Sequence, residues 1–143
     1  PSLSGGVGGE VGGMKSVRIL LTLLAAWLSL GSLAAAAEFR PFSVEAFAQA
    51  QVDGRPILVE AHANWCPTCR MQAPVVRRVA AGAEFERLIV FTLDFDAQAT
   101  ERRALGVRTQ STLIAYSGRT ETSRSVGDTN PQSITALLRT ATR

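Results

Sequence analysis

Three apolar segments of strand length dominate the pattern of hydrophobic and polar positions along the chain. They are "ILVEAHA" at 57–63, "LIVFTLD" at 88–94 and "STLIAYS" at 111–117. Nearly continuous apolar runs with β-branched residues are typical of strands that are buried on both faces of a sheet. Ser117-Gly118 then forms a turn signal before the more polar segment 120–126, which predicts an antiparallel hairpin with an edge strand.

Helical patterns lie between these strands. Ser43 can cap a helix whose apolar residues recur at helical spacing, Gly106 can end another helix, and Asn130-Pro131 can begin the last one. Pro74 is expected to interrupt the helix that follows the first strand. The predicted helices cover residues 44–52, about 66–81, 97–105 and the segment after 131.

The order of these elements predicts an α/β fold. Strands that alternate with helices imply a parallel part of the sheet, to which the C-terminal hairpin adds an antiparallel edge. The segment "EFRPF" at 38–42 adds at most one short strand, because Pro41 cannot donate a hydrogen bond within a sheet. Residues 38–143 are enough for one core and too few for two domains.

The first 37 residues have a different composition and are predicted to lie outside this domain. Residues 1–13 are Gly-rich and show no apolar period, so they are interpreted as a disordered leader or an artefact. Lys15 and Arg18 then form a short positive region ahead of an uncharged apolar run. That pattern is typical of a signal peptide, which we predict over residues 14–37.

The residues at the end of the apolar run bear on whether this segment is a cleaved signal peptide or an uncleaved membrane anchor. Ala35 and Ala37 are small residues at the spacing of a cleavage signal, and they predict removal of the segment after Ala37. The alternative is an uncleaved membrane anchor, because residues 19–37 are just long enough to cross a bilayer. Both interpretations place residues 38–143 in the periplasm or outside the cell, where disulfides persist.

The charge of the chain argues against one class of partner. The formal net charge is +3, and the basic residues are scattered apart from the pairs Arg77-Arg78 and Arg102-Arg103. Nucleic-acid binding would need a clustered basic surface, so we do not expect it. We expect a monomer that needs no cofactor.

The only two cysteines, Cys66 and Cys69, lie directly after a predicted buried strand and at the start of a predicted helix. Free backbone N–H groups and the helix dipole stabilise a thiolate at that position and lower its pKa. Cys66 is nearer the strand and is expected to be the exposed, attacking thiol. Cys69 lies one turn into the helix and is expected to be the more buried, resolving thiol.

Three other roles stay open for the cysteine pair. A structural disulfide would close a loop too short to restrict the unfolded chain much. A zinc site wants about four ligands, and the domain offers two cysteines and one histidine, His62. Inert buried thiols are the third possibility, although Trp65 and Pro67 are unusual neighbours for a plain helix interior. Redox chemistry is the interpretation that we favour.

The segment "ILVEAHANWCPTCRMQAP" resembles the active site of the thioredoxin superfamily. Trp65, Cys66, Cys69 and Pro74 match that motif position by position, and the similarity extends over about residues 42–140. The resemblance implies a three-layer sandwich, with a central mixed sheet, flanking helices and the C-terminal antiparallel hairpin. It also implies thiol–disulfide exchange with protein substrates and a redox partner, through a Cys66–Cys69 disulfide. The residues that it places around a substrate are Trp65, Pro67, Gln110 and Ser111.

Residues within and before the motif indicate the direction of the reaction. Pro67-Thr68 stand between the cysteines where more oxidising family members have Pro-His, and threonine cannot carry a positive charge. Glu60 stands where the reductases of the family have a buried acid, which would have a raised pKa and accept the proton of Cys69. The alternative is that Glu60 reaches the edge of the sheet and is exposed. Together these residues favour reduction of disulfides.

Ser111 is the largest departure from the family pattern. The family has a cis-proline here, which faces the cysteines, grips the substrate and keeps metals away from the sulfurs. We predict a trans Gln110–Ser111 bond, because a non-proline cis bond costs about 2.5–4 kcal/mol. A more open groove and room for a cation beside the thiols are expected to follow. The alternative functions are therefore Cu(I) handling by the cysteines and His62, or a non-catalytic binding module.

Overall fold

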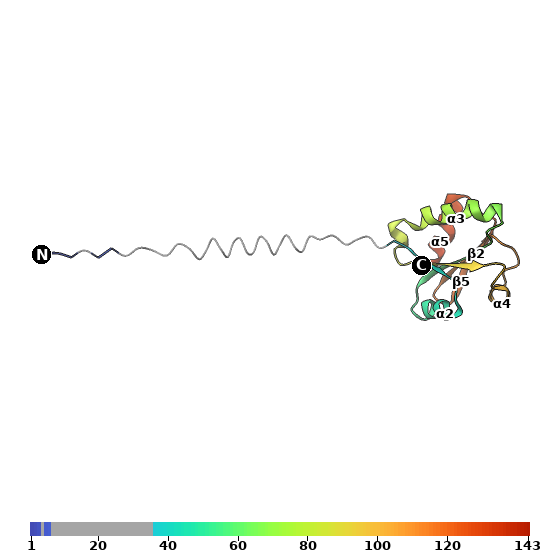
Figure 1. Cartoon of the computed structure of the whole chain (residues 1–143), viewed down its shortest axis with the longest axis horizontal. Coiled ribbons are helices and arrows are strands. Elements are labelled where there is room, and N and C mark those ends of the chain that lie inside the picture. The colour runs from blue at the N-terminus through green and yellow to red at the C-terminus, as the bar shows by residue number, and fades with distance from the viewer. Residues whose placement is uncertain (4, 7–35) are drawn as a thin grey trace. The chain divides into compact units, whose positions relative to one another are not determined.

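The computed structural model describes residues 1–3, 5–6 and 36–143. The chain divides into two units, residues 1–33 and 34–143, and every helix and strand among the described residues belongs to the second unit (Figure 1). The predicted signal peptide lies outside the described residues except for its last two positions. Of the helices in the described part, none is long and apolar enough to cross a membrane.

A five-stranded mixed sheet with the order β1-β3-β2-β4-β5 forms the centre of the second unit. β3 pairs in parallel with β1 and β2, whereas β4 pairs antiparallel with β2 and β5. The three apolar segments form the inner strands, and the polar hairpin strand lies at one edge, as predicted. The strands are β1 (Glu38–Pro41), β2 (Pro56–His62), β3 (Ile89–Asp94), β4 (Thr112–Ser117) and β5 (Thr120–Val126).

Helices cover both faces of the sheet, so the predicted three layers are confirmed. α3 and α5 lie on one face, and α2 and α4 lie on the other (Figure 1). Ser43 caps α2 as predicted, because its hydroxyl accepts a hydrogen bond of 3.2 Å from the Ala46 backbone N–H. The helices are α2 (Val44–Val52), α3 (Pro67–Ala80), α4 (Ala99–Ala104) and α5 (Pro131–Ala141), with a 3-10 helix η1 (Ala83–Phe85).

Alternate residues of β2 point into two separate cores. Leu58 belongs to the core that contains Val76 of α3. Val59 belongs to the core on the opposite face, which Phe47 of α2 packs against. Because side chains alternate along a strand, Glu60 points to the same face as Leu58, towards α3 and α5. The strand thus places a carboxyl group within an otherwise apolar layer.

The helix after the cysteines differs from its prediction. α3 continues through Pro74 instead of being interrupted there. Its second half is held by the buried side chains of Val76 and Ala80, and this packing outweighs the hydrogen bond that a proline cannot donate. The short β1 strand forms as far as Pro41 because it lies at the edge of the sheet, where a missing N–H is tolerated. The 3-10 helix η1 had no counterpart in the sequence prediction.

Candidate active site

The junction of β2 and α3 positions both cysteines. Cys66 is the N-cap residue of α3, and its sulfur accepts a hydrogen bond of 3.2 Å from the Cys69 backbone N–H. Pro67 occupies the start of the helix, where a missing N–H costs nothing because it would have no partner within the helix. The predicted placement of the pair at a helix N-terminus is therefore confirmed.

Both thiols are buried, and this corrects the expectation that Cys66 is exposed. Cys66 is 2% exposed and Cys69 is 1% exposed. They form a small apolar cluster with Ala63, and Phe95 packs against it. Both cysteines are free thiols in this structure.

The two thiols differ in acidity because of the hydrogen bonds between and around them. Burial opposes ionisation of Cys66, but hydrogen bonds from the Cys69 thiol, the Ser111 hydroxyl and the backbone N–H groups of Cys69 and Thr68 lower the pKa of Cys66 to about 7. Burial raises the pKa of Cys69, and the hydrogen bond that it donates to Cys66 raises this pKa further. Cys66 therefore ionises first, and its role as the attacking thiol, with Cys69 as the resolving thiol, stays a prediction.

The hydroxyl of Ser111 faces both sulfurs. Its Oγ lies 3.0 Å from the Sγ of Cys69 and 3.4 Å from the Sγ of Cys66. The peptide bond before Ser111 is trans, as predicted. The sequence prediction placed Ser111 opposite the thiols but assigned its hydroxyl no contact with them. The space beside the thiols thus holds a polar side chain that hydrogen-bonds to both.

A backbone clamp fixes Ser111 in place. Its N–H donates to the Ala61 carbonyl at 2.8 Å, and its carbonyl accepts from the Gly127 N–H at 2.9 Å. The Gln72 side-chain amide donates to the same Ser111 carbonyl at 3.2 Å and to the Asp128 carbonyl at 2.7 Å. Ser111 adopts a positive φ of 58°, a conformation that is uncommon for residues other than glycine.

Sequence reasoning missed Gln72, although its position carried a signal. α3 buries Cys69, Gln72, Val76 and Ala80, which recur at helical spacing and therefore share one face. A glutamine on such a face needs hydrogen-bond partners. Its partners come from the loop before β4 and the loop after β5, so they could not be identified before the fold was known.

Glu60 is buried, as predicted, and does not reach the edge of the sheet. It is 5% exposed, and its Oε1 atom has no hydrogen-bond partner within the described part of the chain. Burial raises the pKa of Glu60 to about 7, although the charge of Arg77 acts in the opposite direction. A carboxyl group with this pKa is protonated at mildly acidic pH and can exchange a proton near neutrality.

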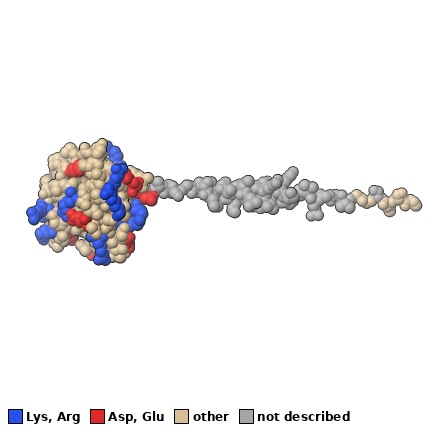
Figure 2. Space-filling view, turned by 180° about the vertical axis from the view of Figure 1, so that it is seen from behind, with Lys and Arg blue, Asp and Glu red and all other residues tan. Residues whose placement is uncertain are grey.

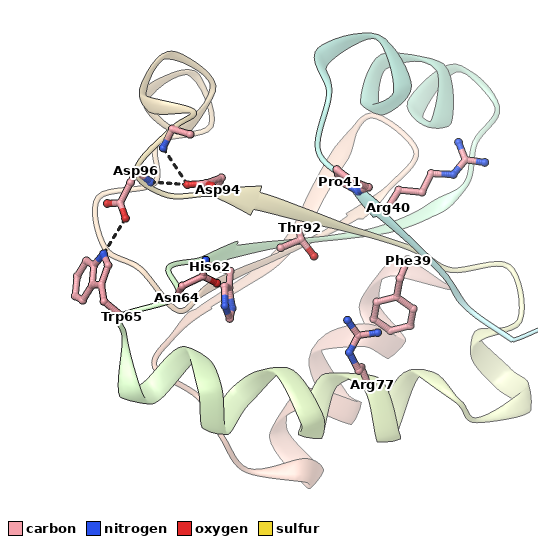
Figure 3. Close-up of a pocket in the computed structure, with 11 residues that line it drawn as sticks. Phe39, Arg40, Pro41, His62, Asn64, Trp65, Arg77, Thr92, Asp94 and Asp96 are labelled. Atoms are coloured by element: carbon pink, nitrogen blue, oxygen red, sulfur yellow. Dashed lines mark hydrogen bonds between the residues drawn. The ribbon is translucent and has the colours of Figure 1, made fainter.

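A pocket of about 590 Å³ opens beside Trp65, between α3 and the edge formed by β1 and β3 (Figure 3). At one end, the indole Nε1 of Trp65 donates a hydrogen bond of 2.7 Å to Asp96 Oδ2. At the other end, the Arg77 guanidinium lies 4.7 Å from the centre of the Phe39 ring. His62 lines this pocket, whereas neither cysteine does. The single histidine, at the end of β2, therefore faces the pocket and not the two sulfurs.

The residues predicted to surround a substrate come together in the fold. Trp65 and Pro67 flank Cys66, and Gln110 precedes Ser111, whose hydroxyl contacts the cysteines. Trp65 is 58% exposed, Pro67 is exposed and Gln110 is half-buried, so the first three residues can reach a partner protein. Ser111 is buried beneath them. Their contact with a substrate stays a prediction.

Metal binding gains no support from the geometry. Among the described residues, no three His, Cys, Asp or Glu side chains are grouped so that they could hold a metal ion.

The surface charge is mixed. On the face drawn in Figure 2, basic and acidic side chains are interspersed. The groups that the structure brings into contact are the two sulfurs and the Ser111 hydroxyl.

Comparison with known proteins agrees with this site. The family model described as Thioredoxin matches residues 38–140. The thioredoxin of Chlamydia muridarum is 34% identical over 82 residues, which cover 57% of this chain and 78% of that protein. The solved structure of Trxlp from Edwardsiella tarda EIB202 has a TM-score of 0.69 at 38% sequence identity, and the match covers 71% of this chain and 98% of that one.

A more distant structure shows the same fold. The thioredoxin of Malassezia sympodialis has a TM-score of 0.65 at 18% identity, over 76% of this chain and 95% of that one. The family model spans nearly the whole second unit and includes both cysteines at the start of α3. This chain is a thiol–disulfide oxidoreductase that belongs to the thioredoxin family.

Proposed function

We propose that this protein reduces disulfide bonds of other proteins outside the cytoplasm. The observation that favours reduction over oxidation is the nature of the hydrogen-bond donors around Cys66. Its thiolate is stabilised by a thiol, a hydroxyl and backbone N–H groups, all of them neutral. Strong oxidants of this fold have a thiolate of very low pKa, which stabilises their reduced form. A pKa of about 7 for Cys66 favours a dithiol that gives up its electrons more readily.

The reaction begins at Cys66. Its thiolate attacks one sulfur of the substrate disulfide, a Cys66–substrate mixed disulfide forms, and the other substrate sulfur leaves as a thiolate that takes up a proton. Cys69 then loses its proton and attacks the Cys66 sulfur. The products are a Cys66–Cys69 disulfide and a substrate with two thiols, so two electrons and two protons pass to the substrate. A dithiol partner must reduce the pair again.

Glu60 serves as the proton acceptor for Cys69 in this proposal. Its carboxyl is buried on the face of β2 that is turned towards α3, and its pKa of about 7 matches proton exchange at neutral pH. The neighbouring residue Ala61 accepts the hydrogen bond from the Ser111 backbone, so β2 also holds the loop opposite the sulfurs. One strand therefore supports both the acid and the loop.

Export is proposed from the sequence of residues 14–37. The positive region, the apolar run and the small residues before Glu38 form the pattern of a cleaved signal peptide. The domain after it contains the two cysteines as a redox pair, and a compartment that permits disulfides suits this chemistry.

An insulin reduction assay tests the proposed activity. With dithiothreitol as electron donor, the wild type should accelerate precipitation of the insulin B chain, and Cys66→Ser should abolish the acceleration. Cys69→Ser should accumulate a mixed disulfide with the substrate, because its resolving thiol is absent. We expect the Cys66–Cys69 couple to have a reduction potential more negative than about −200 mV. A potential close to about −120 mV, as in a strong oxidant, would overturn the direction.

A further inference from the structure

One hydroxyl group stands between the two reacting sulfurs. The Oγ of Ser111 lies 3.0 Å from Cys69 Sγ and 3.4 Å from Cys66 Sγ, within reach of a hydrogen bond to either. A serine hydroxyl has one proton to donate and two lone pairs that can accept. It can therefore donate to only one sulfur at a time, and it can accept from the other.

We propose that Ser111 is a catalytic hydrogen-bond donor that follows the negative charge from Cys66 to Cys69 during the reaction. The proposal rests on the proposed thiol–disulfide exchange and adds a residue to it. Before attack, the hydroxyl donates to the Cys66 thiolate. Once Cys66 is joined to the substrate, its sulfur carries no charge. The hydroxyl then rotates and donates to the Cys69 sulfur, and so stabilises the thiolate that must attack next.

The surroundings of Ser111 hold its backbone in place and leave its hydroxyl group free to rotate. The backbone N–H and carbonyl of Ser111 are held by Ala61 and Gly127, and the Gln72 amide supports the carbonyl from α3. Only the side-chain torsion is left to change. Ser111 is also 2% exposed, so little water competes for its proton and each hydrogen bond to a charged sulfur is strengthened.

The proton balance of the reaction is unchanged by this role. Ser111 keeps its own proton throughout. The proton of Cys69 goes to the buried carboxylate, and the departing substrate sulfur takes its proton from water. Ser111 lowers the energy of two successive thiolates and is neither consumed nor ionised. The proline that the family pattern predicts at this position has no hydroxyl. It could not donate these hydrogen bonds, which depend on the serine present in this chain.

Two variants remove the hydroxyl and differ in their effect on the backbone. Ser111→Gly relieves the strain of the positive φ, whereas Ser111→Ala keeps the strain that Ser111 already bears. An effect shared by both variants therefore reports the lost hydroxyl. Thr112→Val is the matched control, because it removes a neighbouring buried hydroxyl that bonds to the Thr109 carbonyl instead of a sulfur. Circular dichroism and thermal melting establish that each variant is folded.

The first readout needs no turnover. The rate of Cys66 alkylation by iodoacetamide, measured against pH, gives the pKa of Cys66 in each protein. We expect that pKa to rise by roughly one unit in both Ser111 variants and to stay unchanged in Thr112→Val. An unchanged pKa in the two Ser111 variants would overturn the first half of the proposal, whether or not the wild type reduces proteins.

The second readout follows the two chemical steps separately. The reduced protein is mixed with 5,5′-dithiobis(2-nitrobenzoate), whose coloured thiolate is released once when Cys66 attacks and again when Cys69 resolves the mixed disulfide. In Ser111→Gly and Ser111→Ala, the second release should slow about tenfold near pH 7, and its pH profile should move to higher pH. Equal second-phase rates in wild type and both variants would overturn the transfer to Cys69. Failure of the wild type to reduce insulin, with these shifts intact, would instead count against the proposed function alone.

Discussion

The indole nitrogen of Trp65 is tied to the carboxylate of Asp96 by a hydrogen bond of 2.7 Å, across 31 positions of the chain. The bond fixes the exposed residue that precedes Cys66 to the loop that follows β3. A charge-assisted hydrogen bond of this kind restrains an aromatic side chain that would otherwise rotate freely.

Breaking this bond should loosen Trp65 and weaken the binding of substrate. We expect Asp96→Ala to raise the KM for insulin severalfold while the alkylation pKa of Cys66 stays unchanged. Tryptophan fluorescence anisotropy should fall in the same variant. Asp96→Asn is the control, because its amide oxygen can still accept from the indole. If Asp96→Ala leaves both KM and anisotropy unchanged, Trp65 is held by other contacts.

The acidity of Cys66 predicts how reactivity depends on pH. Since the pKa of Cys66 is about 7, its alkylation rate should rise through neutral pH and level off about one pH unit above that value. Cys69 should react far more slowly in the Cys66→Ser protein, because burial raises its pKa. Iodoacetamide labelling of the wild type and Cys66→Ser over a pH series checks both statements. Faster labelling of Cys69 would reverse the assigned roles.

The raised pKa of Glu60 predicts that the folded protein loses stability as pH rises. Its pKa is about 7 in the folded protein, above the ordinary value of 4.5, so the unfolded chain ionises first. Between these two values the unfolded state binds fewer protons, and the free energy of unfolding falls with pH by about 3 kcal/mol in total. Glu60→Gln should remove this loss and be stabilised relative to the wild type above pH 7, while disulfide reduction slows.

Urea unfolding at several pH values measures the effect of Glu60. The matched control is Glu86→Gln, which changes an exposed glutamate at the end of η1. It should follow the wild-type curve. A wild-type free energy of unfolding that is flat between pH 5 and pH 7 relative to Glu60→Gln would show that the Glu60 carboxyl is not held in its protonated form.

Ser111→Pro should destabilise the domain instead of restoring a family-like site. Proline fixes φ near −65°, whereas Ser111 has a φ of 58°, and proline lacks the N–H that bonds to the Ala61 carbonyl. We expect the free energy of unfolding to fall by about 3 kcal/mol. Ser111→Gly should lose much less. Equal denaturation midpoints for the proline and glycine variants would mean that the loop adapts freely.

The N-terminus of the mature protein tests the export proposal. Protein purified from its native host should begin at or near Glu38, because the small residues before it fit a cleavage signal. N-terminal sequencing or intact mass spectrometry determines this directly. Recovery of chains that still begin at or before Met14, in the membrane fraction, would favour the uncleaved anchor.

The amino-acid sequence by itself determined the order of helices and strands, and with it the place of the cysteine pair. These features depend on neighbours in the chain. The apolar run before Cys66 is typical of a buried strand, and Pro67 suits the start of a helix. The sequence left open whether Glu60 is buried or reaches the edge of the sheet, and the structure shows that it is buried. The interruption of α3 was predicted wrongly, since local preference at Pro74 is overridden by packing of the residues beyond it.

The tertiary structure alone decided how the sulfurs are surrounded. Ser111 reaches Cys66 across 45 positions of the chain, and Gln72 reaches Asp128 across 56. No local pattern encodes such contacts, because they exist only once β2, β4 and α3 have packed together. The surroundings of Cys66 have the same origin, because Phe95 comes from the loop after β3 and packs against the cluster that contains both cysteines. The sequence therefore identifies the two reacting sulfurs, and long-range packing determines their acidity and how far they are exposed.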